Sequence, residues 1–164
     1  MYDWRYAYGS YYPRSKDAMS YWATDYPQAL EMIKQAVQGE RNDELFYDDL
    51  ISLAPTREQK TIISSIRDDE RIHNRIYRTM YRQLTGQDVP AGSGDEPYAK
   101  PSSYATGLAQ ALFGELGAVE KYRTIAFSLP CGPYRENVVG IIMDEQKHAD
   151  KYNYLLGLTK ASAR

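Results

Sequence analysis

The sequence has very little of three things, and each shortage excludes a class of protein. A single cysteine excludes an internal disulfide and any cysteine-rich metal site. No apolar run approaches the ~20 residues that a membrane-spanning helix needs. The formal net charge is −2 with the two signs intermixed, so nothing indicates a surface for nucleic acid or an anionic membrane. The first residues, MYDWRYAYGS, also lack the pattern of a signal peptide. We therefore expect a cytoplasmic protein with neither membrane nor nucleic acid as a partner.

The chain of 164 residues is long enough for one domain with a hydrophobic core. Many of its 16 tyrosines lie in residues 1–26, which mix Tyr, Ser, Pro and Gly without a period. This composition predicts an extended, Tyr-rich N-terminal arm. Helical periodicity begins at residue 27 and continues to residue 158, so we expect the folded domain there and a short tail at 159–164.

Four long helices are predicted from this periodicity, and turn residues mark their ends. The first is one continuous helix that Pro55 stops, and a capping box, TREQ, opens the second. The third covers about residues 104–129, and the fourth ends near Gly157. Residues 85–103 are rich in Gly, Pro and Ser and are too long for a tight turn. We expect an all-α fold of two antiparallel helical hairpins joined by this long crossover.

Both histidines of the chain stand in a repeated phrase. DDERIH (68–73) and MDEQKH (143–148) each contain Asp-Glu and then a histidine three residues after the glutamate. A shift of 75 residues aligns the two phrases, and it also aligns Glu40 with Glu115. Most of the aligned identities are polar, aromatic or turn residues, which indicates a repeated site rather than a repeated apolar core.

The spacing of the glutamates predicts that they meet at one depth. Glu40 and Glu70 both lie 15 residues from Pro55, which is ~22 Å along a helix, and Glu115 and Glu145 have the same relation to the second turn. The linker can span ~60 Å when extended, whereas the helices are ~40 Å long. It can therefore place the two turns at opposite ends, so that both ligand levels fall near the middle.

Four buried carboxylates without partners would be very unfavourable, and two divalent cations would satisfy them. A Glu and a His three residues apart on a helix face the same way, so each pair can bind one ion. The predicted metal ligands are Glu40, Glu70, His73, Glu115, Glu145 and His148. Carboxylate and imidazole ligands favour two iron ions, with two manganese ions as the alternative, over structural zinc.

Some residues near this pattern have a simpler interpretation. One Glu-x-x-His pair alone is common on helix surfaces, so the prediction depends on the two copies. Glu44 and Glu120 break the repeat and are expected to be solvated, with Glu44 at the site entrance as an alternative. Cys131 lies in a turn and is expected to have no redox role.

The pattern resembles the ferritin-like superfamily of di-iron carboxylate proteins, in particular its rubrerythrin-like and bacterioferritin-like members. The resemblance covers residues 27–158 and rests on Gly-Glu at 39–40 and 114–115 together with the two Glu-x-x-His motifs. It implies a ferritin-like four-helix bundle in which Glu40 and Glu115 are terminal ligands, and Glu70 and Glu145 bridge the two ions.

The same resemblance implies supporting roles for aspartates and tyrosines. In similar Asp-Glu-x-x-His motifs the carboxylate that contacts each ligating histidine comes from the opposite motif. We therefore predict that Asp69 contacts His148 and that Asp144 contacts His73, the alternative being that the aspartates face solvent or meet Arg71 or Lys147. Tyrosines beside the ligands are expected at Tyr47, seven residues after Glu40, and at its repeat counterpart Tyr122, although packing in the core is the simpler interpretation of both.

The chain also departs from these relatives. It has Ala118 where rubrerythrins usually carry a further glutamate, and Arg71 where bacterioferritin carries its haem-binding methionine. Its single cysteine excludes a rubredoxin-like domain for electron supply. A full rubrerythrin cycle and haem binding are therefore not expected.

The function expected from the resemblance is that of an oxidoreductase reacting with dioxygen or hydrogen peroxide, of the peroxidase or ferroxidase type. Its electron donor is unknown, and we expect a homodimer or higher homo-oligomer. The alternatives are a di-manganese catalase-like enzyme and a structural shell protein, for example of a spore coat, that uses the Tyr-rich arm for assembly.

Overall fold

The computed structural model describes residues 25–38, 40–90 and 98–161, with the side chains of residues 40, 41, 160 and 161 excepted. This part of the chain contains five helices and no strand: α1 (Tyr26–Gln38), α2 (Glu40–Leu53), α3 (Arg57–Thr85), α4 (Tyr104–Ser128) and α5 (Pro133–Ala161). The all-α class expected from the sequence is confirmed. None of these helices is long and apolar enough to cross a membrane.

The helix ends follow local sequence signals. Thr56 caps α3 by accepting a hydrogen bond from the Gln59 amide at 3.2 Å, as the capping box predicts, and Gly86 ends the helix in a left-handed conformation with φ 71°. Ser103 caps α4 in the same way. Pro133 opens α5, where its fixed φ suits a first helical turn.

Two predicted boundaries were wrong. The predicted first helix corresponds to α1, which ends at Gln38, and α2, which begins at Glu40; residue 39 lies outside the described residues, so the continuity of this helix stays a prediction. Helix α1 begins at Tyr26, inside the predicted arm, since Asp25 accepts a hydrogen bond from the Gln28 amide. Residues 1–24 of that arm lie outside the described residues.

The second boundary concerns the C-terminal end of α5. This helix does not end at Gly157 and continues into the predicted tail, to Ala161. Leu155 is fully buried, and Leu156 and Leu158 pack against the same core cluster, so tertiary packing outweighs the low helix propensity of one glycine.

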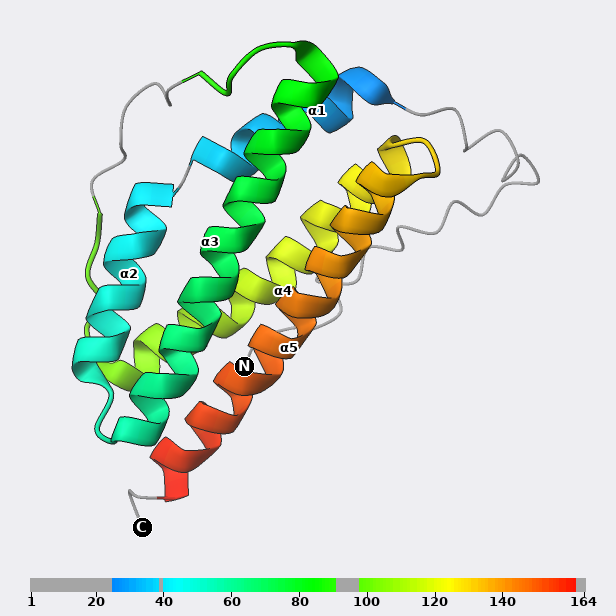
Figure 1. The fold of residues 1–164 in the computed structure, drawn as a ribbon. Helices are drawn as coiled ribbons and strands as arrows, with labels where there is room; N and C mark the ends of the chain where they lie inside the picture. The colour runs from blue at the N-terminus through cyan, green and yellow to red at the C-terminus, as the bar shows by residue number, and fades with distance from the viewer. Residues whose placement is uncertain (1–24, 39, 91–97, 162–164) are drawn as a thin grey trace.

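The helices pack lengthwise, with the two turns at opposite ends (Figure 1). The α2–α3 turn lies at the end where α4 begins, and the α4–α5 turn lies at the other end. Tyr98 and Lys100, from the connection before α4, contact the carboxylate of Asp49 on α2 at 2.7 and 2.6 Å. The predicted crossover geometry therefore agrees with the positions of the turns.

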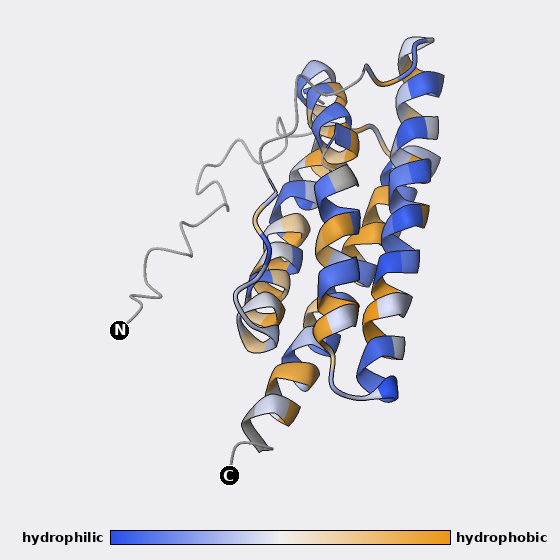
Figure 2. Cartoon of the chain, turned by 90° about the vertical axis from the view of Figure 1, so that its left-hand side faces the viewer, coloured by the Kyte–Doolittle hydropathy of each residue, from blue (hydrophilic) through white to orange (hydrophobic). Residues whose placement is uncertain are grey.

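The hydrophobic core consists of two separate clusters. One lies at the α4–α5 turn and includes Ile33, Tyr77 and Ile125; the other lies at the α2–α3 turn and includes Leu50 and Ile63. Figure 2 shows hydrophobic segments mainly on the helix faces that are turned toward one another. On α3, α4 and α5, the acidic residues and histidines of the repeat lie between the two clusters. The fold thus holds a polar layer in the middle of an apolar interior.

Candidate metal centre

Three helices bring carboxylates and an imidazole to one point in this polar layer. Glu70 of α3, Glu115 of α4, and Glu145 and His148 of α5 each offer a ligand atom, and all of these atoms lie within 4.8 Å of one another. Glu115, Glu145 and His148 are buried, and Glu70 is partly exposed. A buried group of this kind can hold a metal ion.

The second histidine adjoins the same group. Nδ1 of His73 lies 3.2 Å from Oε1 of Glu145 and 3.5 Å from Oε1 of Glu70. The rings of His73 and His148 are roughly parallel, with centroids 5.8 Å apart. Five of the six predicted ligands are therefore together. The sixth, Glu40, is the first residue of α2, and its side chain lies outside the described residues.

Several of these side chains point their ligand atoms toward one another without forming hydrogen bonds, as expected if a metal binds between them. Oε1 of Glu70, Oε1 of Glu145 and the Nδ1 atoms of both histidines are buried and have no hydrogen-bond partner. This holds although Nδ1 of His148 is only 3.0 Å from Oε1 of Glu70. Buried polar atoms are rarely left unpaired in folded proteins. Four unpaired ligand atoms that lie close together fit bound cations that satisfy them, so the donor set suits a bound metal.

The crossed aspartate contacts predicted from the sequence are present. Oδ2 of Asp69 lies 3.0 Å from Nε2 of His148, and Oδ2 of Asp144 lies 3.2 Å from Nε2 of His73. A histidine that donates its Nε2–H to an aspartate keeps the lone pair of Nδ1 for a metal. In both rings it is Nδ1 that faces the glutamates.

The alternative partner of the aspartates is present as well. Nζ of Lys147 lies 2.6 Å from Oδ1 of Asp144 and 3.2 Å from Oδ2 of Asp69. Burial tends to raise the pKa of both aspartates, but their contacts with histidine and Lys147 lower it below its ordinary value. One ammonium group therefore helps to keep both carboxylates ionised as acceptors for the two imidazoles.

Without a metal, protonation of the two histidines balances the charge of the neighbouring carboxylates. Burial lowers the pKa of His73, but the neighbouring carboxylates of Glu145 and Glu70 outweigh it and raise that pKa to about 10. For His148 the carboxylates raise the pKa to about 12 in the same way. Burial raises the pKa of Glu115 to about 9; burial also acts to raise the pKa of Glu145, but the two histidines outweigh it and lower that pKa to about 2. At neutral pH the metal-free centre therefore combines two imidazolium groups with the ionised Glu145 and the protonated Glu115.

Tyrosines surround the polar layer. Tyr77 and Tyr152, each four residues after a histidine of the repeat, are buried, and their hydroxyls have no hydrogen-bond partner. The ring of Tyr122 lies 5.2 Å from that of Tyr77. Burial, followed by the charge of Glu70 among other groups, raises the pKa of Tyr47 well above its ordinary value. These phenols stay neutral, and Tyr77 and Tyr152 are the members of the two apolar clusters that adjoin the charged centre.

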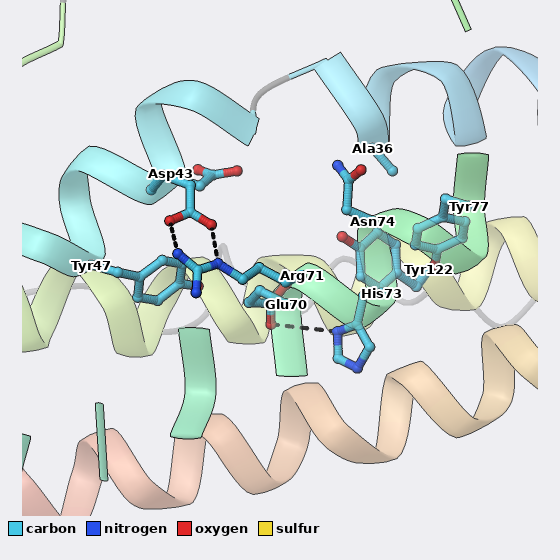
Figure 3. Close-up of a pocket in the computed structure, with 10 residues that line it drawn as sticks. Ala36, Asp43, Tyr47, Glu70, Arg71, His73, Asn74, Tyr77 and Tyr122 are labelled. Carbon is cyan, nitrogen blue, oxygen red and sulfur yellow. Dashed lines mark hydrogen bonds and ion pairs between the residues drawn. The ribbon is translucent and has the colours of Figure 1, made fainter. Parts of the chain in front are cut away.

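A cavity of about 50 Å³ reaches the centre between α1–α2 and α3 (Figure 3). The residues around it are Ala36, Asp43, Glu44, Tyr47, Glu70, Arg71, His73, Asn74, Tyr77 and Tyr122. The guanidinium of Arg71 donates from Nε and Nη2 to the two carboxylate oxygens of Glu44, each at 2.6 Å. Glu44 therefore lines the cavity, as in the alternative prediction that placed it at the site entrance. Its carboxylate is paired with Arg71.

Sequence reasoning missed the pairing of Glu44 with Arg71. Arg71 directly follows Glu70, and its contact with Glu44 depends on how α2 is rotated relative to α3. No periodic signal could have located it, because a helical period does not fix how two neighbouring helices are rotated relative to each other.

Comparison with known proteins gives one weak relative. The uncharacterized protein YhjR of Bacillus subtilis (strain 168) is 28% identical over 130 residues, which are 79% of this chain and 88% of that protein. No family model matches the chain, and no solved structure matches it.

Proposed function

We propose that the protein is a di-iron carboxylate oxidoreductase that reacts with dioxygen or hydrogen peroxide. The observation that carries this proposal is the set of four buried ligand atoms, on Glu70, His73, Glu145 and His148, that lie close together without hydrogen-bond partners. A pair of iron ions would supply electrons to the oxidant. A pair of manganese ions is the alternative cofactor, because manganese accepts the same ligand types.

We further propose that the chain has the ferritin-like bundle, with α1 and α2 together in the place of its first helix. The opposite positions of the two turns and the central layer of acidic residues and histidines support this assignment. In this arrangement Glu40 and Glu115 would be terminal ligands, and Glu70 and Glu145 would bridge.

The side chains around the centre have distinct parts in the proposed reaction. Asp69 and Asp144 hold the two imidazoles with Nδ1 directed at the ligand position. The buried rings of Tyr77 and Tyr152 limit the access of water. The cavity beside Arg71 has room for a molecule the size of peroxide, and it ends at Glu70 and His73. The substrate would therefore arrive from the α2–α3 side.

The test begins with metal binding to the purified full chain. Anaerobic titration with Fe(II), followed by removal of unbound metal and elemental analysis, is expected to give two ions per chain. Exposure to dioxygen or peroxide should then oxidise the bound iron faster than free iron, as measured by loss of chelatable Fe(II). Failure to bind iron or manganese stoichiometrically would refute the metal centre. Stoichiometric binding without faster oxidation would refute only the oxidoreductase.

Metal binding has a second readout that does not need activity. A ligand that binds only the folded state raises the unfolding temperature by mass action. The metal-loaded protein should therefore unfold at a higher temperature than the chelator-treated protein, and reloading should restore the difference.

A further inference from the structure

Helix α4 is unusual because it is apolar on the side that faces away from the core. From Tyr104 to Val119 its only charged residue is Glu115, which is buried in the polar layer. Its exposed side carries Phe113, 71% exposed, and Leu116. A helix that is apolar all round is normally covered on all sides.

Helix α5 carries a similar exposed stripe. Val139, Met143 and Tyr154 are all exposed, Met143 by 65%, and they lie on the side of the helix away from its buried residues. Phe127 near the end of α4 belongs to the same surface, because the guanidinium of Arg135 on α5 lies 5.5 Å from its ring centroid.

The two stripes adjoin along the seam between the helices. On α4, a side-chain carbon added at Gly107 would lie 2.5 Å from Leu50, so that flank faces α2 and the opposite flank faces α5. On α5, Asp144 contacts His73, so that flank faces α3 and the opposite flank faces α4. Leu116, nine residues and therefore about 180° round the helix from Gly107, lies on the flank of α4 that faces α5 and borders the seam. We call this the seam surface: Phe113, Leu116, Phe127, Val139, Met143 and Tyr154.

The seam surface is large for a monomer. It contains six of the eight large hydrophobic side chains that are exposed in the described part of the chain. Together they expose on the order of 500 Å² of apolar area, near the upper end for single-chain proteins. With its polar surroundings this approaches the ~800 Å² per partner of a stable interface.

Glycines on the exposed sides of these helices add a second observation. A side-chain carbon at Gly117 of α4 or at Gly140 of α5 would meet no atom within 4 Å. Each glycine within a helix costs up to ~1 kcal/mol of stability relative to alanine. Nothing within the described chain compensates for this cost, whereas close approach of another helix would.

We infer that the seam surface is the docking site for a second copy of this chain in a two-fold symmetric dimer. The exposed charges near it favour a second copy over an unrelated protein. Glu120 and Arg123 lie one turn apart on α4, have opposite charge and form no ion pair with the described residues. Antiparallel packing of α4 on its two-fold mate places Glu120 of each copy beside Arg123 of the other, so the surface is complementary to itself.

The first test measures the oligomeric state of the full chain by sedimentation velocity over a range of concentrations. The wild-type chain is expected to be a dimer at micromolar concentration. Phe113→Glu combined with Met143→Glu should raise the dimer dissociation constant at least ~100-fold, because both side chains lie in the buried centre of the interface. Leu45→Glu, at an exposed leucine on α2 outside the seam surface, is the matched control and should leave the dimer intact. Circular dichroism checks that the helices are retained.

Charge reversal tests whether the partner is a second copy. Glu120→Arg and Arg123→Glu should each weaken the dimer, since each places like charges opposite one another. An equimolar mixture of the two variants should assemble into heterodimers, and the double reversal in one chain should restore the homodimer.

Three results would overturn the inference. One is a monomeric wild-type chain over the whole range, including the case in which the N-terminal segment covers the seam surface within one chain. Another is a dimer that the Phe113 and Met143 substitutions leave unchanged. The third is a mixture of the two charge variants that stays monomeric.

Discussion

Helices α3 and α5 supply the same residues to the centre, but their outer surroundings differ. Each carries an Asp-Glu-x-x-His phrase whose inward residues meet in the polar layer. The outer side of α3 is charged, and Arg67 and Arg71 pair with Asp48 and Glu44 of α2. The outer side of the α4–α5 hairpin exposes large apolar side chains instead.

This difference shows that residue identity within the internal repeat is retained at the inward positions and varies at the outward ones. At the inward positions the two phrases are identical, whereas at the outward positions Asp68 corresponds to Met143 and Ile72 to Lys147. A ligand position tolerates few residue types, because each must offer an oxygen or a nitrogen at a fixed place. A surface position depends on its neighbour, and in our interpretation that neighbour is α2 for one hairpin and a second copy for the other.

The largest expected effect comes from removing the inward residues that the two halves share. Glu70→Ala combined with Glu145→Ala should lower metal affinity by more than ~100-fold, beyond the range found for outer partners of a metal site. Equilibrium dialysis with Fe(II) or Mn(II) measures it. The control removes two exposed carboxylates, Glu58 and Glu136, one from each hairpin. Full two-metal binding by the first variant would contradict the ligand assignment.

The two sides of α4 can be compared through its glycines. Gly107→Ala should destabilise the fold by about 1–3 kcal/mol, because the added methyl would lie 2.5 Å from Leu50 and 3.1 Å from Pro101. Gly117→Ala meets no atom and should stabilise the helix by up to ~1 kcal/mol. Denaturant unfolding of the monomeric Phe113→Glu, Met143→Glu background gives both values without a contribution from assembly. Equal effects of the two substitutions would contradict the distinction between the packed and the open side.

A smaller and symmetric effect is expected from the crossed aspartates. Asp69→Asn and Asp144→Asn should each leave the helical content unchanged and weaken metal affinity by ~10-fold, because each removes the charge that fixes one imidazole. The exposed Asp150→Asn on α5 serves as the control. If neither variant changes metal affinity, the crossed contacts have no role in metal binding.

The ion pair between Glu44 and Arg71 should contribute least. Glu44→Gln is expected to cost less than ~1 kcal/mol at neutral pH, since both side chains are partly exposed and solvent screens their charges. Arg71 lowers the pKa of Glu44 below its ordinary 4.5. The contribution is therefore fully present above pH 4.5 and is lost as the pH falls through the lowered value. Unfolding of the wild type and Glu44→Gln should differ at pH 7 and converge in acid.

Much of the fold could be predicted because its signals are local. The capping residue Thr56 and the terminator Gly86 fix the ends of α3, and the helical period identifies its buried face. The same reasoning failed where tertiary packing outweighs local preference. Leu155 is fully buried, and its packing keeps α5 helical past Gly157.

The contacts between α3 and α5 at the site could be predicted from the sequence, whereas the contact between α2 and α3 could not. The contacts of Asp69 with His148 and of Asp144 with His73 followed from a repeated phrase. The pairing of Arg71 with Glu44 did not, because it joins residues from outside the repeat on helices whose relative rotation the sequence leaves open. The Asp–His contacts could be predicted because both residues belong to a repeated motif. The ion pair between Arg71 and Glu44 could not, because no motif links these two residues.

The crossed contacts also have a consequence for the order of folding. They join residues 71 and 79 positions apart, one from each hairpin. Contacts between distant parts of a chain form only after the intervening loop has closed. Neither hairpin alone can hold its histidine in place, so a competent centre forms only when both hairpins have docked in the correct register. A nascent or misdocked chain would lack the oriented imidazoles, and ligand-site formation would mark the last step of its maturation.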